Sequence, residues 1–120
     1  MQIEYMIKKI DFHDSNVIEL LQEKNKVRLR IDLCMWRQEG FEEGDEELKE
    51  VLLEFVRVED YIWEANKAEA DIDYDTILEV HYSNGTLKIV LENDGVSIIA
   101  FKCNTVKFTP DILQSERGRK

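Results

Sequence analysis

Short segments in which apolar and polar side chains alternate constrain the fold of this 120-residue chain more than any other feature. The clearest segment is 27–33, which reads VRLRIDL. Successive side chains of an extended strand point to opposite faces, so this segment has one apolar face and one charged face. The sequence therefore predicts a sheet with one face buried and the other in water.

Residues 77–103 show the strongest local signal. Asn84-Gly85 separates two alternating segments, and this pair tolerates the positive φ angles of a type I′ hairpin turn. Asn93-Asp94-Gly95 makes a second turn before the next apolar run. We therefore expect a three-stranded antiparallel meander over 77–103, with 106–108 extending its last strand beyond a kink at Asn104.

The N-terminal part of the chain is less regular. Ile3, Tyr5 and Ile7 alternate with polar positions, and 17–21 forms another apolar stretch before a polar turn. Both segments are therefore predicted as strands.

The segment 46–66 fits either a helix or strands. Its apolar residues have helical spacing behind an Asp45 cap, but 51–55 also alternates as a strand does. We favour the strand, because the β-branched valines of 56–58 would end a helix there in any case.

These patterns predict a mainly β fold, or an α+β fold with one short helix between 45 and 66. About seven or eight antiparallel strands would form a sandwich or a half-barrel. A chain of 120 residues suits one domain with a single core. We expect that domain to span 1–113, followed by a frayed polar tail at 114–120.

The acidic charge is confined to the middle of the chain. With 26 acidic and 16 basic residues, the net charge is −10 at pH 7, which argues against a nucleic-acid or membrane partner. Residues 37–75 hold fifteen acidic and four basic residues and sum to −11, whereas the parts before and after them sum to 0 and +1. The carboxylates fall in two stretches, 39–50 and 59–75.

Signals for a cellular compartment are few. Residues 1–9 lack the apolar region of a secretory signal, and the longest apolar run, 98–101, is far shorter than the roughly 20 residues that span a bilayer. We expect a cytoplasmic protein in which Cys34 and Cys103 are reduced and buried.

The segment Phe12-His13-Asp14-Ser15 places an imidazole, a carboxylate and a hydroxyl side by side in the sequence. Neighbouring side chains of an extended chain point apart, so we expect a turn in which Asp14 and Ser15 bind backbone donors, and not a catalytic triad. We expect His81 on the polar face of its strand. His13, Asp14 and His81 are the candidates for an acid–base or metal-dependent enzyme, but their spacing matches no zinc motif, and we predict no metal or cofactor.

The run Asp71-Ile72-Asp73-Tyr74-Asp75 has the first ligand spacings of a calcium loop. Thr76 stands where that loop requires glycine, and Tyr82 stands where it requires a bidentate glutamate. An EF-hand is therefore excluded, and we expect an acidic, solvated loop.

Aromatic residues lie within and beside the two acidic stretches. Rings surrounded by carboxylates suit the capture of a basic protein, because the rings supply contact area and the charges steer the partner. The alternative is an acidic solubilising loop whose aromatic residues fill the edge of the core. The candidate partner-binding residues are Trp36, Phe41, Glu42, Glu43, Asp45, Glu46, Glu47, Tyr61, Trp63, Asp71, Asp73 and Asp75.

Four features follow one another along the chain: FHDS at 12–15 and the segments 27–33, 53–58 and 98–108. Their order resembles a group of small bacterial β-rich domains with an N-terminal His-Asp-Ser motif. Most of these domains are uncharacterised, and some are regarded as candidate immunity proteins of toxin systems. The resemblance implies that 51–58 is a strand, and it carries over no functional residue.

The sequence favours a non-enzymatic protein-binding module, such as an immunity protein whose acidic middle third covers a basic toxin. One alternative is a small hydrolase or metal-dependent enzyme that uses His13, Asp14 and His81. Another is an accessory domain whose acidic face keeps it in solution.

Overall fold

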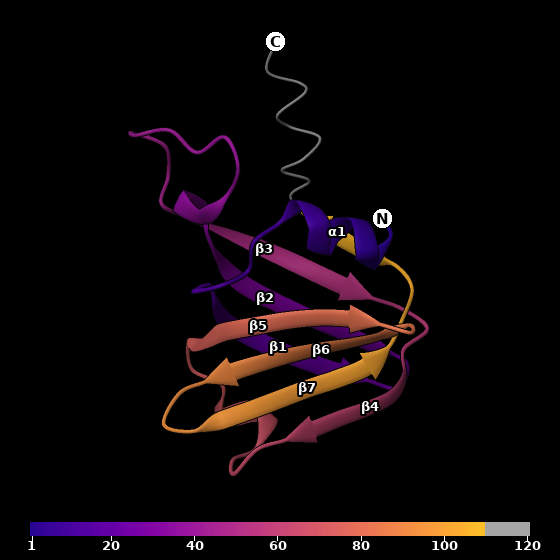
Figure 1. The fold of residues 1–120 in the computed structure, drawn as a ribbon. Helices are drawn as coiled ribbons and strands as arrows, with labels where there is room; N and C mark the ends of the chain where they lie inside the picture. Colours follow the sequence, from indigo (N-terminus) through magenta and orange to yellow (C-terminus); the bar gives the residue numbers. More distant parts are fainter. Residues whose placement is uncertain (110–120) are drawn as a thin grey trace.

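The computed structural model describes residues 1–109, which form a single sheet of eight antiparallel strands together with one short α-helix (Figure 1). The strands are β1 (Asn16–Glu23), β2 (Lys26–Cys34), β3 (Leu48–Phe55), β4 (Glu59–Glu64), β5 (Asp75–Ser83), β6 (Thr86–Glu92), β7 (Val96–Lys102) and β8 (Val106–Thr109). The other elements are the helix α1 (Ile3–Lys9) and two 3₁₀ helices, η1 (Met35–Arg37) and η2 (Glu69–Asp71). The prediction of a mainly β, antiparallel fold is confirmed. Residues 110–113 of the expected domain and its expected tail at 114–120 lie outside the described residues.

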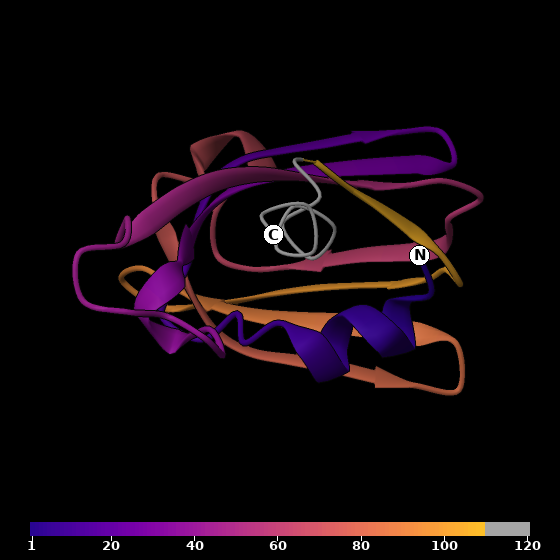
Figure 2. The same ribbon diagram turned by 90° about the horizontal axis from the view of Figure 1, so that it is seen from above.

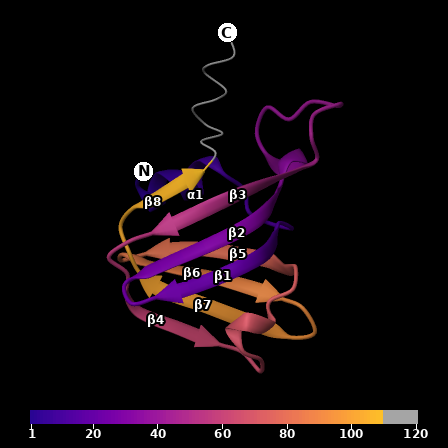
Figure 3. The ribbon, with the colours of Figure 1, turned by 180° about the vertical axis from the view of Figure 1, so that it is seen from behind.

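The sheet folds over into two layers. Its strand order is β4-β7-β6-β5-β1-β2-β3-β8. At the fold, β1 and β5 share only two residue pairs, Asn16 with Thr76 and Val17 with Asp75. One layer is therefore β8-β3-β2-β1 and the other is β5-β6-β7-β4 (Figures 2 and 3). The end strands β4 and β8 do not pair with each other, so the sheet is open and not a closed barrel.

The core lies between the layers and follows the alternation of the sequence. In β2, Val27, Leu29, Ile31 and Leu33 are all at most 1% exposed. The second layer contributes its own alternating residues, and Phe55 of β3 meets Phe101 of β7 edge to face, with 5.0 Å between ring centroids. The one-sided strands that the sequence predicts therefore enclose one apolar core.

The predicted meander at 77–103 is present as β5, β6 and β7. Asn84 and Gly85 have φ angles of 52° and 78°, as a type I′ turn requires. The expectation that 106–108 extends the last strand is wrong. After Lys102 the chain crosses to the other layer, where β8 pairs with β3 and buries Val106 and Phe108 against the core.

The N-terminal strand prediction is also wrong, because residues 3–9 form α1. Ile3, Met6 and Ile10 recur at the three- and four-residue spacing of a helix, and all three are buried, whereas Tyr5 is 48% exposed. The helix lies beside β5, which has no strand partner on that side beyond Thr76 (Figure 2). It thereby covers backbone groups that would otherwise form an open strand edge.

Residues 46–66 contain β3 and β4, so the strand that we favoured there is confirmed and the alternative helix is wrong. Cys34 and Cys103 are free and buried, as expected. No helix within residues 1–109 has the length and apolar character needed to cross a membrane.

Candidate functional site

The turn at 11–15 joins α1 to β1 and rests on β5. Ile77 donates its N–H to the Ser15 carbonyl at 2.7 Å, and its carbonyl accepts the Asp14 N–H at 3.0 Å. The Ser15 hydroxyl oxygen is buried and accepts the N–H of Cys34 at 2.8 Å. The expectation that Ser15 binds a backbone donor is confirmed, and the hydroxyl is therefore not free to act as a nucleophile.

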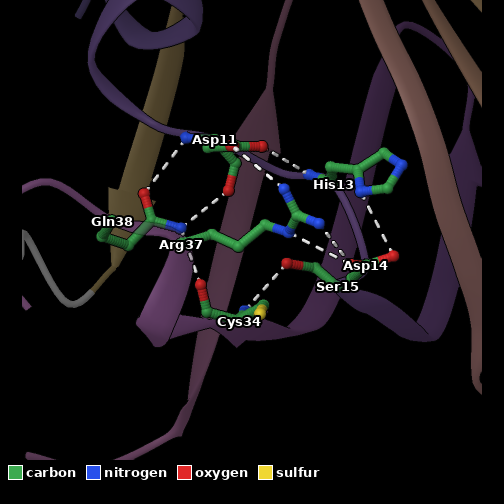
Figure 4. Close-up of polar contacts among 7 residues, drawn as sticks. All are labelled: Asp11, His13, Asp14, Ser15, Cys34, Arg37 and Gln38. Atoms are coloured by element: carbon green, nitrogen blue, oxygen red, sulfur yellow. Dashed lines mark hydrogen bonds and ion pairs between the residues drawn. The ribbon is translucent and has the colours of Figure 1, made fainter.

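Asp14 binds a side chain, which corrects the expectation that it binds backbone donors. Arg37 donates from Nε and Nη2 to one carboxylate oxygen of Asp14, at 3.0 and 2.8 Å (Figure 4). His13 Nδ1 lies 3.2 Å from the other oxygen. Desolvation opposes ionisation of Asp14, but Arg37 and His13 outweigh it and hold the pKa of this carboxyl below its usual value.

Gln38 fixes the same turn from the other side. Its amide nitrogen donates to the carbonyls of Asp11 and Cys34 at 2.7 and 2.8 Å, and its amide oxygen accepts the Asp11 N–H at 3.1 Å (Figure 4). The Met35 N–H donates to the Glu47 carbonyl at 2.8 Å, which closes the segment between them. Both ends of residues 38–47, which we call the acidic loop, are therefore held in place.

The acidic loop projects from the sheet, as Figures 1 and 3 show. It turns at Gly40 and Gly44, whose φ angles are 85° and 99°, conformations that favour glycine. Phe41 is half-buried, and Trp36 beside the loop is 50% exposed. The carboxylates of the loop are all exposed, and none forms an ion pair within residues 1–109: Glu39, Glu42, Glu43, Asp45, Glu46 and Glu47.

The second group of candidate residues lies elsewhere. The acidic loop stands at the top of the molecule, whereas β4 and η2 stand at the bottom (Figures 1 and 3). In β4, the Tyr61 hydroxyl donates to Glu69, and the Trp63 indole N–H donates to the Lys67 carbonyl at 2.8 Å. Both rings pack against the core, so they hold the segment that follows β4. The two acidic stretches therefore do not form one surface.

Asp75 is not a surface residue, which corrects its place among the partner-binding candidates. It is 0% exposed, and Lys67 Nζ lies 2.7 Å from one carboxylate oxygen and 2.9 Å from the other. Burial opposes its ionisation, but Lys67, the Asp73 N–H and the Asn93 amide outweigh burial and lower the pKa of Asp75. Asp71 and Asp73 remain exposed.

Two of the three enzyme candidates lie along a cleft of about 440 Å³ between the end of α1, the 11–13 turn, the start of the acidic loop and β5. His13 and His81 both line it, and Asp14, engaged by Arg37, does not. His81 is exposed on the polar face of β5, as expected, with its Nε2 2.8 Å from Glu79 Oε1. Within residues 1–109, no three His, Cys, Asp or Glu side chains are placed to hold a metal ion together.

Sequence reasoning missed Arg37, Gln38 and Lys67 as positioning residues. Arg37 and Lys67 carried one signal, because basic residues are scarce in the acidic middle of the chain. Each of them binds a carboxylate that the fold keeps near the sheet. Gln38 carried no such signal.

Comparisons with known proteins assign no function to the chain. No family model matches the chain, and no curated protein matches it. The chain is similar to the crystal structure of an uncharacterized protein from Neisseria gonorrhoeae, with 14% identity and a TM-score of 0.49 over 83% of this chain and 94% of that chain.

Proposed function

We propose that this protein is a non-enzymatic binding module that captures a basic protein through its acidic loop, as an immunity protein covers a basic toxin such as a nuclease. One observation carries the proposal: six exposed carboxylates without ion pairs sit on a loop whose two ends are fixed. On the sheet, some carboxylates are already paired, since Arg30 lies beside both Glu19 and Glu50. The loop carboxylates are instead clustered on one short segment and free to pair with a partner.

The arrangement suits binding for two physical reasons. Clustered like charges accelerate encounter with an oppositely charged surface, and the effect weakens as salt screens them. A loop whose base is already ordered by Arg37 and Gln38 loses less conformational entropy on binding than a free loop does. Trp36, half exposed beside the loop, offers an aromatic contact of the kind that dominates binding energy in interfaces.

The test uses the partner that co-purifies with the protein from its native host. In one variant, Glu42, Glu43, Asp45, Glu46 and Glu47 are replaced by their amides. In the matched control, the same number of exposed carboxylates is replaced outside the loop: Glu23, Glu59, Glu64, Glu92 and Asp94. We expect the association rate to fall about tenfold or more in the loop variant and much less in the control.

An association rate that is indifferent to salt, or equal in the two variants, would contradict the proposal. If the loop variant loses solubility but keeps its partner, the solubilising role is correct instead. Both variants should unfold at nearly the same urea concentration as the wild type, because exposed carboxylates without ion pairs contribute little to stability, and the amide that replaces Asp45 can still accept the Glu42 N–H.

A second candidate function is acid–base catalysis in the cleft. The observation that favours it is that His13 and His81, distant in the sequence, line one cleft, each beside a carboxylate. One imidazole would accept a proton while the other donates one. Hydrolysis of model esters or phosphodiesters that is lost in both His13→Ala and His81→Ala would support it. Equal rates in the wild type and both variants would contradict it.

A further inference from the structure

The edge of β3 that faces β8 is only partly covered within residues 1–109. β2 pairs with β3 along its whole length, from Leu48 to Phe55, whereas β8 pairs only with Leu52–Phe55. The edge at 48–51 therefore has no strand partner among the described residues. Backbone groups point alternately to the two sides of a strand, so every second residue of 48–51 offers its N–H and C=O to this open side. Leu48 adds an apolar side chain that is 46% exposed.

The chain itself runs along this edge. β8 is antiparallel to β3 and reaches Thr109 opposite Leu52, so its direction leads toward the start of β3 and the acidic loop (Figure 3). If the register continued without a shift, 110–113 would lie beside 48–51. Pro110 donates no hydrogen bond, but an edge strand tolerates a proline. The segment that follows β8 is therefore placed to cover the open edge of β3.

Two apolar residues of this segment, Ile112 and Leu113, suit the position. Alternation along the strand would put Ile112 on the same side as the buried Phe108 of β8. Leu113 would fall on the outward side, opposite the exposed Leu48. Apolar side chains directly opposite each other stabilise a pair of neighbouring strands. The segment thus supplies one apolar side chain for each face of the sheet at this edge.

The charges of the segment also match what lies along its path. Asp111 would lie beside Glu50, whose charge Arg30 already balances at 3.5 Å. Farther along, 117–120 reads RGRK, three basic residues without an acidic one and the densest group of bases in the chain. Beyond the start of β3 the path meets the acidic loop, which holds six carboxylates and no basic residue. The basic end of the chain and the acidic loop are therefore complementary in charge.

We propose that residues 110–120 dock on their own molecule: 110–113 continue β8 along the open edge of β3, and 117–120 lie against the acidic loop. The chain thereby closes a strand edge that could otherwise pair with another chain. Because the segment is tethered at Thr109, its effective concentration at the loop is of the order of millimolar, so individually weak ion pairs hold it there. The tail at 114–120 is then held by charge, and not frayed as its polarity alone predicts.

The docked segment regulates the acidic loop, and this consequence rests on the function proposed above. A basic partner must displace 117–120 before it pairs with the loop carboxylates. When a site is open for only part of the time, its apparent affinity falls by the open fraction. The segment is therefore a built-in competitor, which a strongly basic surface displaces and a weakly basic one does not.

Hydrogen exchange of the full chain tests the docking on β3 and needs no partner. In the variant Ile112→Gly/Leu113→Gly, the amides of 48–51 that face away from β2 should exchange about tenfold faster than in the wild type, or more. The matched control is Gln114→Gly/Ser115→Gly, which gives the chain the same added freedom beyond the start of β3. It should leave exchange at 48–51 unchanged. Equal exchange in all three proteins would overturn the docking on β3.

Paramagnetic broadening tests the contact with the acidic loop. The probe is a nitroxide on Ser115→Cys, because Cys34 and Cys103 are buried. It should broaden the amides of the acidic loop. The broadening should disappear in the tail variant, in which the three basic residues are replaced by glutamine: Arg117, Arg119 and Lys120. It should remain in a matched control with three exposed bases replaced at the opposite end of β2 and β3: Lys24, Lys26 and Arg57.

Three results would overturn the contact with the loop: loop amides that are not broadened, broadening that survives in the tail variant, and broadening that disappears on dilution. The last would place the contact between two copies. Salt should weaken the broadening, since it screens exposed charges.

The captured partner separates this proposal from the proposed function. The tail variant should bind the partner about threefold more tightly than the wild type, and its control should bind as the wild type does. If the loop variant with five amides keeps the partner, the proposed function fails, whereas the two tests without a partner still decide the docking. If the loop variant loses the partner but the tail variant binds no more tightly than the wild type, the competition is refuted.

Discussion

The acidic loop at 38–47 and the acidic segment at 64–75 carry similar charge but are built differently. The loop holds six carboxylates and no basic residue, and all of them stay exposed. The segment holds five carboxylates and Lys67, and the fold draws two of the five inward: Asp75 pairs with Lys67, and Glu69 accepts from Tyr61. Charge density alone therefore does not define a binding surface. The presence of a nearby cation or hydroxyl decides whether a carboxylate stabilises the fold or stays available to a partner.

The largest expected effect follows from breaking the buried pair. Lys67→Met leaves the Asp75 carboxylate fully buried with only the Asp73 N–H and the Asn93 amide as donors. We expect the free energy of unfolding to fall by about 2–3 kcal/mol, below the full cost of breaking a buried pair because Lys67 is partly exposed. Urea unfolding measures it. The control Lys107→Met, at an exposed position of β8, should change stability by less than about 0.5 kcal/mol.

A stability loss equal to that of the Lys107→Met control would contradict this account of Asp75. It would place the segment at 64–75 in the same class as the acidic loop, with carboxylates that do not support the fold. A double variant that adds Asp75→Asn removes the unpaired charge, so it should be more stable than Lys67→Met alone.

We also expect the two regions to differ in how they make the free energy of unfolding depend on pH. The pKa of Asp75 is lower in the folded chain than in the unfolded one, so its ionised form stabilises the fold above the unfolded value of about 3.9. That contribution disappears as the pH falls through the folded value. Urea unfolding between pH 6 and pH 3 should therefore show a steeper loss for the wild type than for Asp75→Asn. The loop variant with five amides should follow the wild type, and parallel curves for Asp75→Asn would refute the assignment.

The strands could be predicted from the sequence because each has several alternating residues and turns with clear signals, as at Asn84-Gly85. Three alternating residues at the N-terminus are too few to establish a strand. The three- and four-residue spacing of the buried Ile3, Met6 and Ile10 corresponds to the helix that forms there. The partner of β8 could not be predicted, because pairing between distant strands depends on how the whole sheet folds over.

Only the contacts between residues close in the sequence could be predicted for the candidate site. The sequence singled out His13-Asp14-Ser15 as a turn and found the role of Ser15 as a backbone acceptor. The partner of Asp14 is Arg37, 23 residues away, and no local pattern connects the two. The alternation of Asp75 with Asp71 and Asp73 predicts a solvated carboxylate. Its burial follows from its position at the start of β5, where the two layers join.

The smallest effect on stability is expected at the clamp that holds the acidic loop. Arg37→Ala removes the ion pairs with Asp14 and Asp11, whose side chains are exposed, so the free energy of unfolding should fall much less than in Lys67→Met. Its local effect should be larger, because Arg37 ties the start of the loop to the turn at 11–15. Hydrogen exchange should accelerate at the Met35 and Asp14 amides, which donate across the base of the loop and onto β5.

Arg28→Ala is the matched control, since it removes another exposed ion pair, that with Glu54 on the sheet. It should leave exchange at Met35 and Asp14 unchanged. Faster exchange in Arg37→Ala alone would mean that Arg37 keeps the base of the loop fixed. In that case Arg37→Ala should also lower the association rate with a captured partner, although it removes no acidic charge. Exchange that is unchanged in both variants would mean that Gln38 and the closure between Met35 and Glu47 hold the loop without Arg37.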